Sequence, residues 1–182
     1  MNTEHTYSAF AGDKRLLTGS LLNVALALKN QADHSAAVLI FNDQTGQQID
    51  VNISGSETDI QQRYAAPEAA KKVGRPKLGV ISREITLQQK HWDWLDLQSA
   101  SASAVIRKLI DKELNNPASE SNIMLAKQAA DRFMSAMLGN MPNYEEAARA
   151  LYQGRKDIFL ALIEGYPEDL REYLMLQTRD LF

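Results

Sequence analysis

Residues 71–114 constrain the fold of this chain more than any other stretch. They begin with a basic arm, continue with a short alternating segment and an aromatic helix, and end with a Ser/Ala turn and a second helix that carries a regular apolar stripe. A single strand of this length is not stable alone, so it needs a partner strand and a layer of helices over its apolar face. We interpret this stretch as the centre of the chain, with one module on either side.

The alternating segment covers residues 81–87. Its two parities differ in polarity: one contains Ile81, Arg83, Ile85 and Leu87, and the other contains Ser82, Glu84 and Thr86. This pattern predicts a strand with one mostly apolar face and one polar face. Two copies paired antiparallel across a two-fold axis would bury Ile85 and Leu87 over the helices. The polar face would then form a ribbon that fits a major groove.

Two helices are predicted after this strand, at residues 88–98 and from Ala102 onward. In the first, Trp92 and Leu95 are expected to point inward and Trp94 toward a neighbouring module. The second has apolar residues at the i, i+3, i+4, i+7 and i+8 positions of a stripe, namely Ala102, Val105, Ile106, Leu109, Ile110 and Leu114.

The N-terminus of the second helix is a candidate phosphate contact. Free backbone N–H groups and the helix dipole favour an anion at such an end. Ser101 or Ser103 would supply a cap and a hydroxyl contact, and Arg107 or Lys108 would add positive charge.

Positive charge is concentrated in the same stretch. The net charge of the chain is −3, yet residues 69–90 contain six cations against one anion. Four of these cations form a basic arm: Lys71, Lys72, Arg75 and Lys77. The GRPK segment within it is similar to arms that enter the narrow minor groove of A·T-rich DNA. A solvated basic linker is the alternative interpretation.

Strand parity conflicts with base-specific reading of DNA. Ribbons that read bases normally present Arg, Lys, Asn, Gln or Thr outward, whereas here Glu84 is outward and Arg83 has the inward parity. Three alternatives stay open. The ribbon is irregular near its start and frees Arg83, or the unit binds DNA mainly through the arm, or it keeps a dimeric fold without a DNA role.

The flanking segments predict an α+β protein. Residues 6–54 have a ββαββ pattern whose last strand is the alternating stretch 48–54, followed by one or two helical turns with Ser56 and Asp59 as candidate caps. After Pro117, four short helices predict a helical bundle. The first starts at residues 119–121, and the second opens with a capping-box pattern at Asn143. We therefore expect a small α+β module (residues 1–64), a basic linker (65–80), a strand-helix-helix unit (81–116) and a helical module (117–182).

Composition argues against several classes of function. The chain has no cysteine, so a disulfide, a thiolate metal site and a cysteine nucleophile are excluded, and its three histidines lie far apart. The carboxylate pairs Glu145–Glu146 and Glu168–Asp169 fall in first helical turns, where the helix dipole explains them. We expect no enzyme activity, no metal and no cofactor. The N-terminus lacks a signal-peptide pattern and no apolar run reaches about 18 residues, so a cytoplasmic location is expected.

The segment VGRPKLGVISREITLQQKHWDWL, together with RFMSAML and EEAARALYQG, resembles an uncharacterised bacterial family, domain of unknown function 2239, over nearly the whole chain. This resemblance implies no activity, cofactor or site. A narrower resemblance, over residues 82–114, is to ribbon-helix-helix DNA-binding regulators. It matches in hydrophobic pattern, turn and helix cap, and departs at Glu84 and Arg83.

These observations lead to one main hypothesis and one alternative. The main hypothesis is a homodimeric DNA-binding protein, of the kind that regulates transcription, with a ribbon-helix-helix-like centre and a GRPK arm. Its expected DNA-binding residues are Lys71, Lys72, Arg75, Lys77, Ser82, Arg83, Thr86, Ser101, Ser103 and Arg107. The alternative is a non-enzymatic adaptor that uses the centre only for dimerisation and its C-terminal helices to bind a partner protein.

Overall fold

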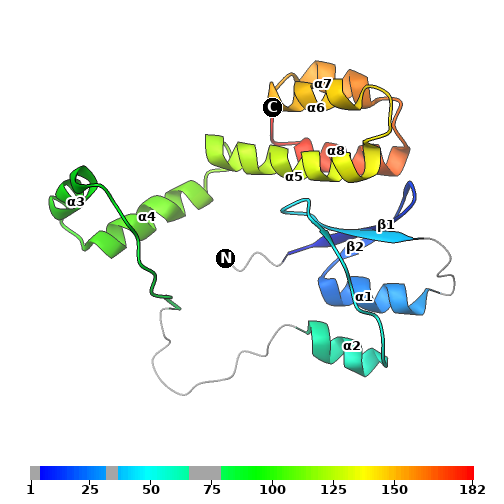
Figure 1. Ribbon diagram of the computed structural model, residues 1–182, viewed down its shortest axis with the longest axis horizontal. Helices are drawn as coiled ribbons and strands as arrows, with labels where there is room; N and C mark the ends of the chain where they lie inside the picture. Colours follow the sequence, from blue (N-terminus) through cyan, green and yellow to red (C-terminus); the bar gives the residue numbers. More distant parts are fainter. Residues whose placement is uncertain (1–4, 32–36, 66–78) are drawn as a thin grey trace. The chain divides into compact units, whose positions relative to one another are not determined.

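The computed structural model describes residues 5–31, 37–65 and 79–182 (Figure 1). The chain divides into two compact units. The main unit contains residues 1–65 and 117–182, and the central unit contains residues 66–116. The fold is α+β, as the sequence predicts, with a small antiparallel sheet near the N-terminus followed by helices.

The sheet of the main unit has four strands in the order β2-β1-β3-β4. Its strands are β1 (Tyr7–Ala11), β2 (Lys14–Gly19), β3 (Val38–Asn42) and β4 (Gln48–Ile49), and all neighbouring pairs are antiparallel. Gly12 adopts a positive φ of 55° at the turn between β1 and β2, a conformation that glycine accommodates without steric cost. The predicted ββαββ order is therefore confirmed.

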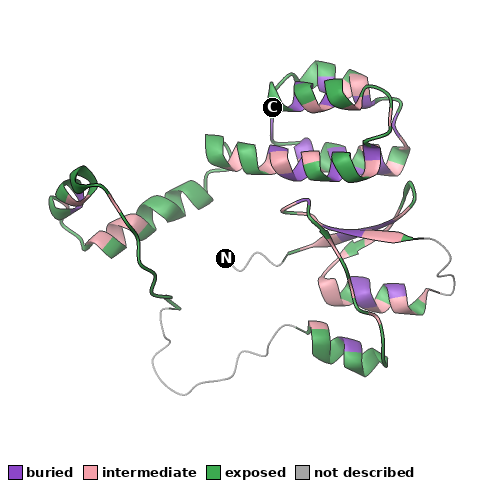
Figure 2. Ribbon diagram, viewed as in Figure 1, coloured by how far each residue is buried: buried purple, intermediate pink, exposed green. Residues whose placement is uncertain are grey.

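Helices cover both faces of this sheet. Those of the main unit are α1 (Leu21–Asn30), α2 (Glu57–Tyr64), α5 (Glu120–Leu138), α6 (Tyr144–Tyr152), α7 (Lys156–Ile163) and α8 (Glu168–Thr178). Because side chains alternate along a strand, Ala9 and Ile40 pack with α1 on one face, and Phe10 and Phe41 pack with α5 and α8 on the other. Figure 2 shows buried residues in both α1 and α5.

An aromatic cluster forms the centre of the larger core. Phe133 of α5 lies with its ring centroid 5.4 Å from Phe10 and 5.2 Å from Phe41, and 4.5 Å from Tyr173 of α8. The first and last segments of the chain thus share one hydrophobic core, although the sequence pattern treated them as separate modules.

The strand predicted for residues 48–54 is shorter than expected. Only Gln48 and Ile49 pair with β3. Beyond them the backbone bonds to α2 instead, because Arg63 Nη1 donates to the carbonyl oxygen of Asn52 at 2.7 Å and the backbone N–H of Asn52 donates to Tyr64 Oη at 2.7 Å. Side chains of α2 therefore end the sheet at this edge.

Helix ends agree with their predicted caps in two cases and differ in a third. Ser56 and Asp59, the two candidate caps, form a capping box at the start of α2, and Ser119, at the predicted start of α5, caps that helix. Asn143 precedes α6 as expected, but it lies in the left-handed region at φ 63° and its side chain makes no cap hydrogen bond. The capping box predicted at Asn143 is therefore wrong, because this backbone conformation does not orient the side chain over the first turn.

The central unit contains two helices, α3 (Gln89–Asp96) and α4 (Ala102–Leu114). Leu95 is the only residue of its described part that is buried, and Trp94 is 46% exposed. Residues 79–88 form neither a helix nor a strand. The strand predicted at residues 81–87 is therefore not seen in the described chain. Among the helices that the structure describes, none has the length and apolarity that a membrane crossing requires.

Candidate functional site

The predicted basic arm falls outside the part of the chain that the structure describes. Lys71, Lys72, Arg75 and Lys77 all lie outside the described residues. The other six predicted DNA-binding residues are described, and all six are exposed: Ser82, Arg83, Thr86, Ser101, Ser103 and Arg107.

Ser82, Arg83 and Thr86 belong to a segment that has no partner strand in the described part of the chain. Its apolar residues are also uncovered, since Ile81 is 79% and Ile85 is 54% exposed. A strand that is already paired on both edges could not form a ribbon with a second copy. No described strand pairs with either edge of residues 81–87, so both edges are available to a second copy.

Ser101 and Ser103 lie at the start of α4, as predicted. Ser101 is the N-cap residue and its carbonyl oxygen accepts from the N–H groups of Ala104 and Val105 at 2.8 and 3.0 Å. The Ser101 hydroxyl makes no hydrogen bond to the first turn of α4. The prediction that this hydroxyl caps the helix is therefore wrong. Ser101 is exposed, and Arg107 is exposed six residues further along the chain.

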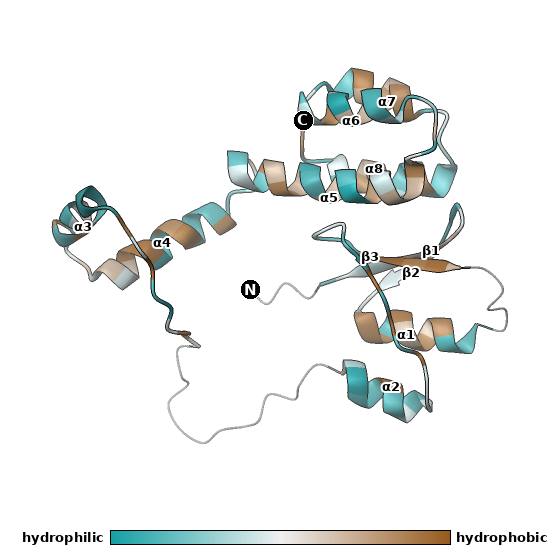
Figure 3. Cartoon of the chain, in the orientation of Figure 1, coloured by the Kyte–Doolittle hydropathy of each residue, from teal (hydrophilic) through white to brown (hydrophobic). Residues whose placement is uncertain are grey.

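Apolar side chains remain uncovered along α4. Leu109 and Ile110 are each about half exposed, and Leu114 is 69% exposed. Figure 2 colours this helix as exposed or intermediate throughout, and Figure 3 shows hydrophobic positions along it. Two hollows of about 450 and 580 Å³ lie against α3 and α4, and Trp94 and Leu109 contribute to both. The central unit therefore has an apolar surface that its own described residues do not bury.

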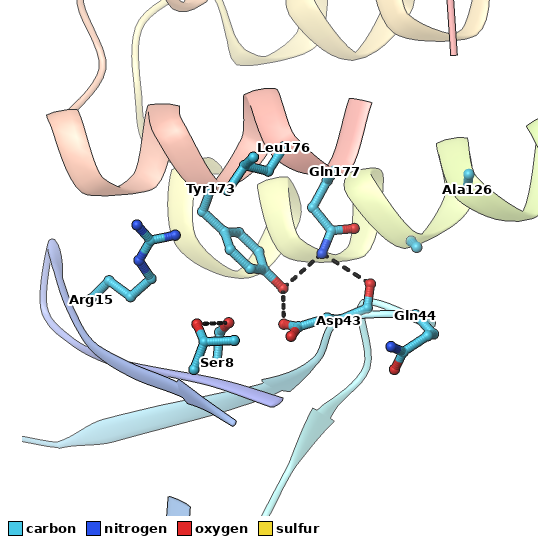
Figure 4. Close-up of a pocket in the computed structure, with 10 residues that line it drawn as sticks. Ser8, Arg15, Asp43, Gln44, Ala126, Tyr173, Leu176 and Gln177 are labelled. Atoms are coloured by element: carbon cyan, nitrogen blue, oxygen red, sulfur yellow. Dashed lines mark hydrogen bonds between the residues drawn. The ribbon is translucent and has the colours of Figure 1, made fainter. Parts of the chain in front are cut away.

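A second candidate site, which the sequence did not predict, is a cavity of about 450 Å³ in the main unit (Figure 4). It lies where β1, β2 and the turn after β3 meet α5 and α8. Ala126 and Leu176 give it an apolar wall, and its polar side chains are Ser8, Arg15, Thr18, Asp43, Gln44, Tyr173 and Gln177.

Tyr173 is the centre of a hydrogen-bonded group in this cavity. Its hydroxyl donates to Asp43 Oδ1 at 2.7 Å and accepts from Gln177 Nε2 at 2.8 Å. Gln177 Nε2 also donates to the backbone carbonyl of Asp43 at 3.0 Å. Burial, reinforced by the neighbouring Asp43 carboxylate, raises the pKa of the Tyr173 phenol far above its ordinary value. The hydroxyl therefore stays protonated and holds the carboxylate in place.

Two hydroxyl side chains lie on the sheet side of the cavity. Ser8 of β1 and Thr18 of β2 are register partners, and their hydroxyl oxygens are 2.7 Å apart. Ser8 is fully buried on the same face as Phe10. The sequence analysis missed this site: a small polar residue on an otherwise aromatic face could have indicated it, but the residues opposite Ser8 come from the far end of the chain.

Arg15 provides positive charge at the cavity. Its backbone N–H donates to Asp169 Oδ2 at 2.9 Å, which fixes β2 against the start of α8. Its Nη2 lies 3.8 Å from Glu172 Oε2, a long contact to a half-exposed carboxylate. The guanidinium therefore keeps hydrogen-bond donors that the Glu172 contact does not use.

Among the residues that the structure describes, no group of three or more His, Asp or Glu side chains could hold a metal ion. The cavity instead combines one cation, one carboxylate, several hydroxyl and amide groups and an apolar wall. This composition is typical of a site for a small organic molecule.

One family model matches residues 6–177, and its description reads "Uncharacterized protein conserved in bacteria (DUF2239)". The family resemblance found in the sequence is thereby confirmed. No curated protein and no solved structure matches the chain.

Proposed function

The chain belongs to this bacterial family, DUF2239, and we propose that it is a DNA-binding homodimer whose two copies meet through the central unit. One observation carries the proposal: the central unit, whose two helices are α3 and α4, buries only Leu95 among its described residues and leaves the apolar stripe of α4 exposed. Exposed apolar patches of this kind mark interaction surfaces in soluble proteins.

The exposed side chains are numerous enough to hold a dimer. Residues 79–116 of each copy include eight large ones: Val80, Ile81, Ile85, Trp94, Leu97, Leu109, Ile110 and Leu114. Completing the burial of a half-covered side chain contributes about 1 kcal/mol, so both copies together gain on the order of 16 kcal/mol. Association costs roughly 4–15 kcal/mol in lost freedom of motion. The gain is comparable to that cost, so we expect a dimer that is stable only if most of these side chains are buried.

Residues 81–87 are the segment that would pair across the two-fold axis. In such an isologous contact the two copies use the same surface patch, which is complementary to itself. Antiparallel pairing would satisfy the backbone groups of both segments and cover Ile85 over the helices. The opposite face would carry Ser82, Glu84 and Thr86 toward a major groove.

Charge supports an approach to DNA through the arm. Residues 66–116 contain nine cations and six anions, whereas the rest of the chain has a net charge of −6. The described residues 79–116 alone contain five cations and five anions, so the surplus comes from the arm. With about four to six phosphate contacts, log affinity should fall with log salt at a slope of about −4 to −5.

DNA binding is tested by fluorescence anisotropy on random and genomic fragments at two or more salt concentrations. The expected result is salt-dependent binding that is lost when Lys71, Lys72, Arg75 and Lys77 are all replaced by Ala. A matched control replaces four exposed cations of the main unit, Arg149, Arg155, Lys156 and Arg179, because it changes net charge equally. Absence of binding at low salt, or equal losses in both variants, would contradict the DNA role.

Dimerisation is tested separately by sedimentation equilibrium. We expect a dimer for the natural chain and a monomer for Ile85→Glu and Leu109→Glu, because a carboxylate at either position would be buried without a partner. Ile158→Glu is the control, since Ile158 is a similarly exposed isoleucine of the main unit. A natural chain that is monomeric at high concentration would overturn the proposed assembly.

A non-enzymatic adaptor is the second candidate function. The equal numbers of cations and anions in residues 79–116 favour it, because a neutral strand-helix-helix unit attracts DNA only weakly. In this case the dimer persists, the anisotropy series shows no DNA binding, and an affinity-tagged chain retains a partner protein through its C-terminal helices. Loss of dimerisation without the arm would contradict this alternative.

A further inference from the structure

The cavity between the sheet and α8 presents two opposite charges to one pocket that is open to solvent. Arg15 lies on β2 and Asp43 in the turn after β3, and Figure 4 shows the Tyr173 side chain between them. The Tyr173 hydroxyl donates a hydrogen bond to Asp43 Oδ1. Within the described chain, Asp43 Oδ2 accepts no hydrogen bond. The cavity volume of about 450 Å³ falls within the range of roughly 300–1,000 Å³ that small-molecule sites have.

We propose that this cavity binds a small zwitterionic molecule of the amino-acid class, with its carboxylate at Arg15, its ammonium at Asp43 and its apolar side chain against Leu176 and Ala126. A planar guanidinium can donate two parallel hydrogen bonds to a carboxylate. A carboxylate oxygen with a free lone pair accepts from an ammonium in the same way. This assignment does not depend on DNA binding.

The surroundings make the two charged contacts more effective than they would be at the surface. Ser8 is fully buried and Tyr173 is 4% exposed, so both flank the cavity with desolvated groups. Charges act more strongly across a partly dry space than through water. The Tyr173 hydroxyl holds the Asp43 carboxylate and Gln177 holds the Asp43 backbone carbonyl, so the carboxylate is oriented before any ligand arrives.

The competing charge beside Arg15 is too distant to satisfy it. Glu172 Oε2 is 3.8 Å from Arg15 Nη2 and is about half exposed, so this ion pair is weak. A ligand carboxylate that reaches hydrogen-bond distance would displace or share that contact. Ser8 and Thr18, whose hydroxyls are 2.7 Å apart, offer further hydrogen bonds along the ligand.

The test uses the full chain and three probes that differ by one charged group each: leucine, 4-methylpentanoate, which lacks the ammonium, and 3-methylbutylamine, which lacks the carboxylate. Phenylalanine and tryptophan extend the series to larger side chains. Isothermal titration calorimetry should detect binding of at least one amino acid. Each of the two single-charge analogues should bind at least about tenfold more weakly than leucine if leucine is the ligand that fits.

Variants identify the site. Arg15→Gln and Asp43→Asn should each weaken binding of that amino acid about tenfold or more, since each removes one charged partner. Asp131→Asn is the matched control, because Asp131 accepts a hydrogen bond from Tyr152 in the same way outside the cavity. Arg179→Gln is the control for arginine. Circular dichroism establishes that each variant is folded, and Arg15→Lys, which keeps the charge but loses the planar fork, gives a second measurement at that position.

Three results would overturn the proposal. One is absence of heat and of a Tm shift with every amino acid tested. Another is equal affinity for leucine and its two analogues, because the charged groups would then contribute nothing. The third is unchanged binding in both Arg15→Gln and Asp43→Asn, which would place the ligand elsewhere on the chain.

Discussion

The hydroxyl of Tyr173 donates a 2.7 Å hydrogen bond to Asp43 Oδ1 and so connects two residues that are 130 positions apart in the chain. The Tyr173 ring also packs 4.5 Å from Phe133 and 5.1 Å from Phe10. The last helix is therefore part of the same core as the first strands, and the cavity beside Tyr173 exists only when both ends of the chain are in place.

Removing this hydroxyl should destabilise the main unit. Tyr173→Phe leaves Asp43 and Gln177 without their shared partner, and we expect the free energy of unfolding to fall by about 1–3 kcal/mol. Urea denaturation followed by far-UV circular dichroism measures the change. Tyr152→Phe is the control, because its hydroxyl also bonds to an Asp at 2.9 Å but in an exposed setting, where the expected change is below about 0.5 kcal/mol. Equal losses in the two variants would contradict the structural role of the Tyr173 bond.

Alkaline pH should unfold the protein partly through Tyr173. Burial raises the pKa of this phenol in the folded state, while the unfolded chain ionises near the ordinary value of about 10. The stabilising contribution is therefore complete below about pH 10 and is lost progressively as pH rises above it, since only the unfolded state then releases the proton. Denaturation curves from pH 8 to 11 should decline less steeply for Tyr173→Phe. An identical decline for both proteins would disprove this linkage.

Gly46 should tolerate no side chain. It adopts φ 65° in the turn between β3 and β4, and an added Cβ would overlap the carbonyl oxygen of Ala129 on α5. Gly46→Ala combines a left-handed backbone cost of about 1–2 kcal/mol with overpacking of about 1–3 kcal/mol. Gly12→Ala has a similar φ of 55° but open space around it, so only the backbone cost applies. Thermal unfolding of the two variants compares them directly, and a smaller loss at Gly46 would argue against this close approach.

Acid pH should weaken the start of α2. Backbone and side-chain hydrogen bonds from Ser56 lower the pKa of Asp59 in the folded protein. The contribution of this capping box is present above the ordinary carboxyl value of about 4 and is lost as pH falls through the lowered value. An NMR titration of the Asp59 carboxyl carbon measures the pKa, and Ser56→Ala should move it part of the way back. No movement in that variant would mean that the hydroxyl contact is absent in solution.

Helices were predicted well where their signals are local. Ser56, Ser119 and Ser101 mark the starts of α2, α5 and α4 as expected, and the helix predicted at residues 88–98 corresponds to α3 (Gln89–Asp96). Caps and apolar periodicity involve residues within about four positions of one another, so they can be read without knowing the tertiary fold.

Strands were harder to predict, because alternation shows a possible strand and not its partner. Residues 48–54 alternate regularly, yet Arg63 and Tyr64 bond to the backbone of Asn52 and end the sheet after Ile49. Residues 81–87 also alternate, and within the described chain they have no strand to pair with. The proposed second copy is the partner that would complete this segment.

The order of the helices, the α+β class and the family of this chain follow from its sequence, because they depend on local periodicity, caps and a distinctive segment around residues 73–95. The shared core and the cavity do not follow from it. Both depend on Phe10, Asp43 and Ser8 meeting Phe133, Tyr173 and Gln177 across more than one hundred intervening positions. Such contacts form only when the chain buries the aromatic face of its sheet, and no local pattern indicates which distant helix will cover that face.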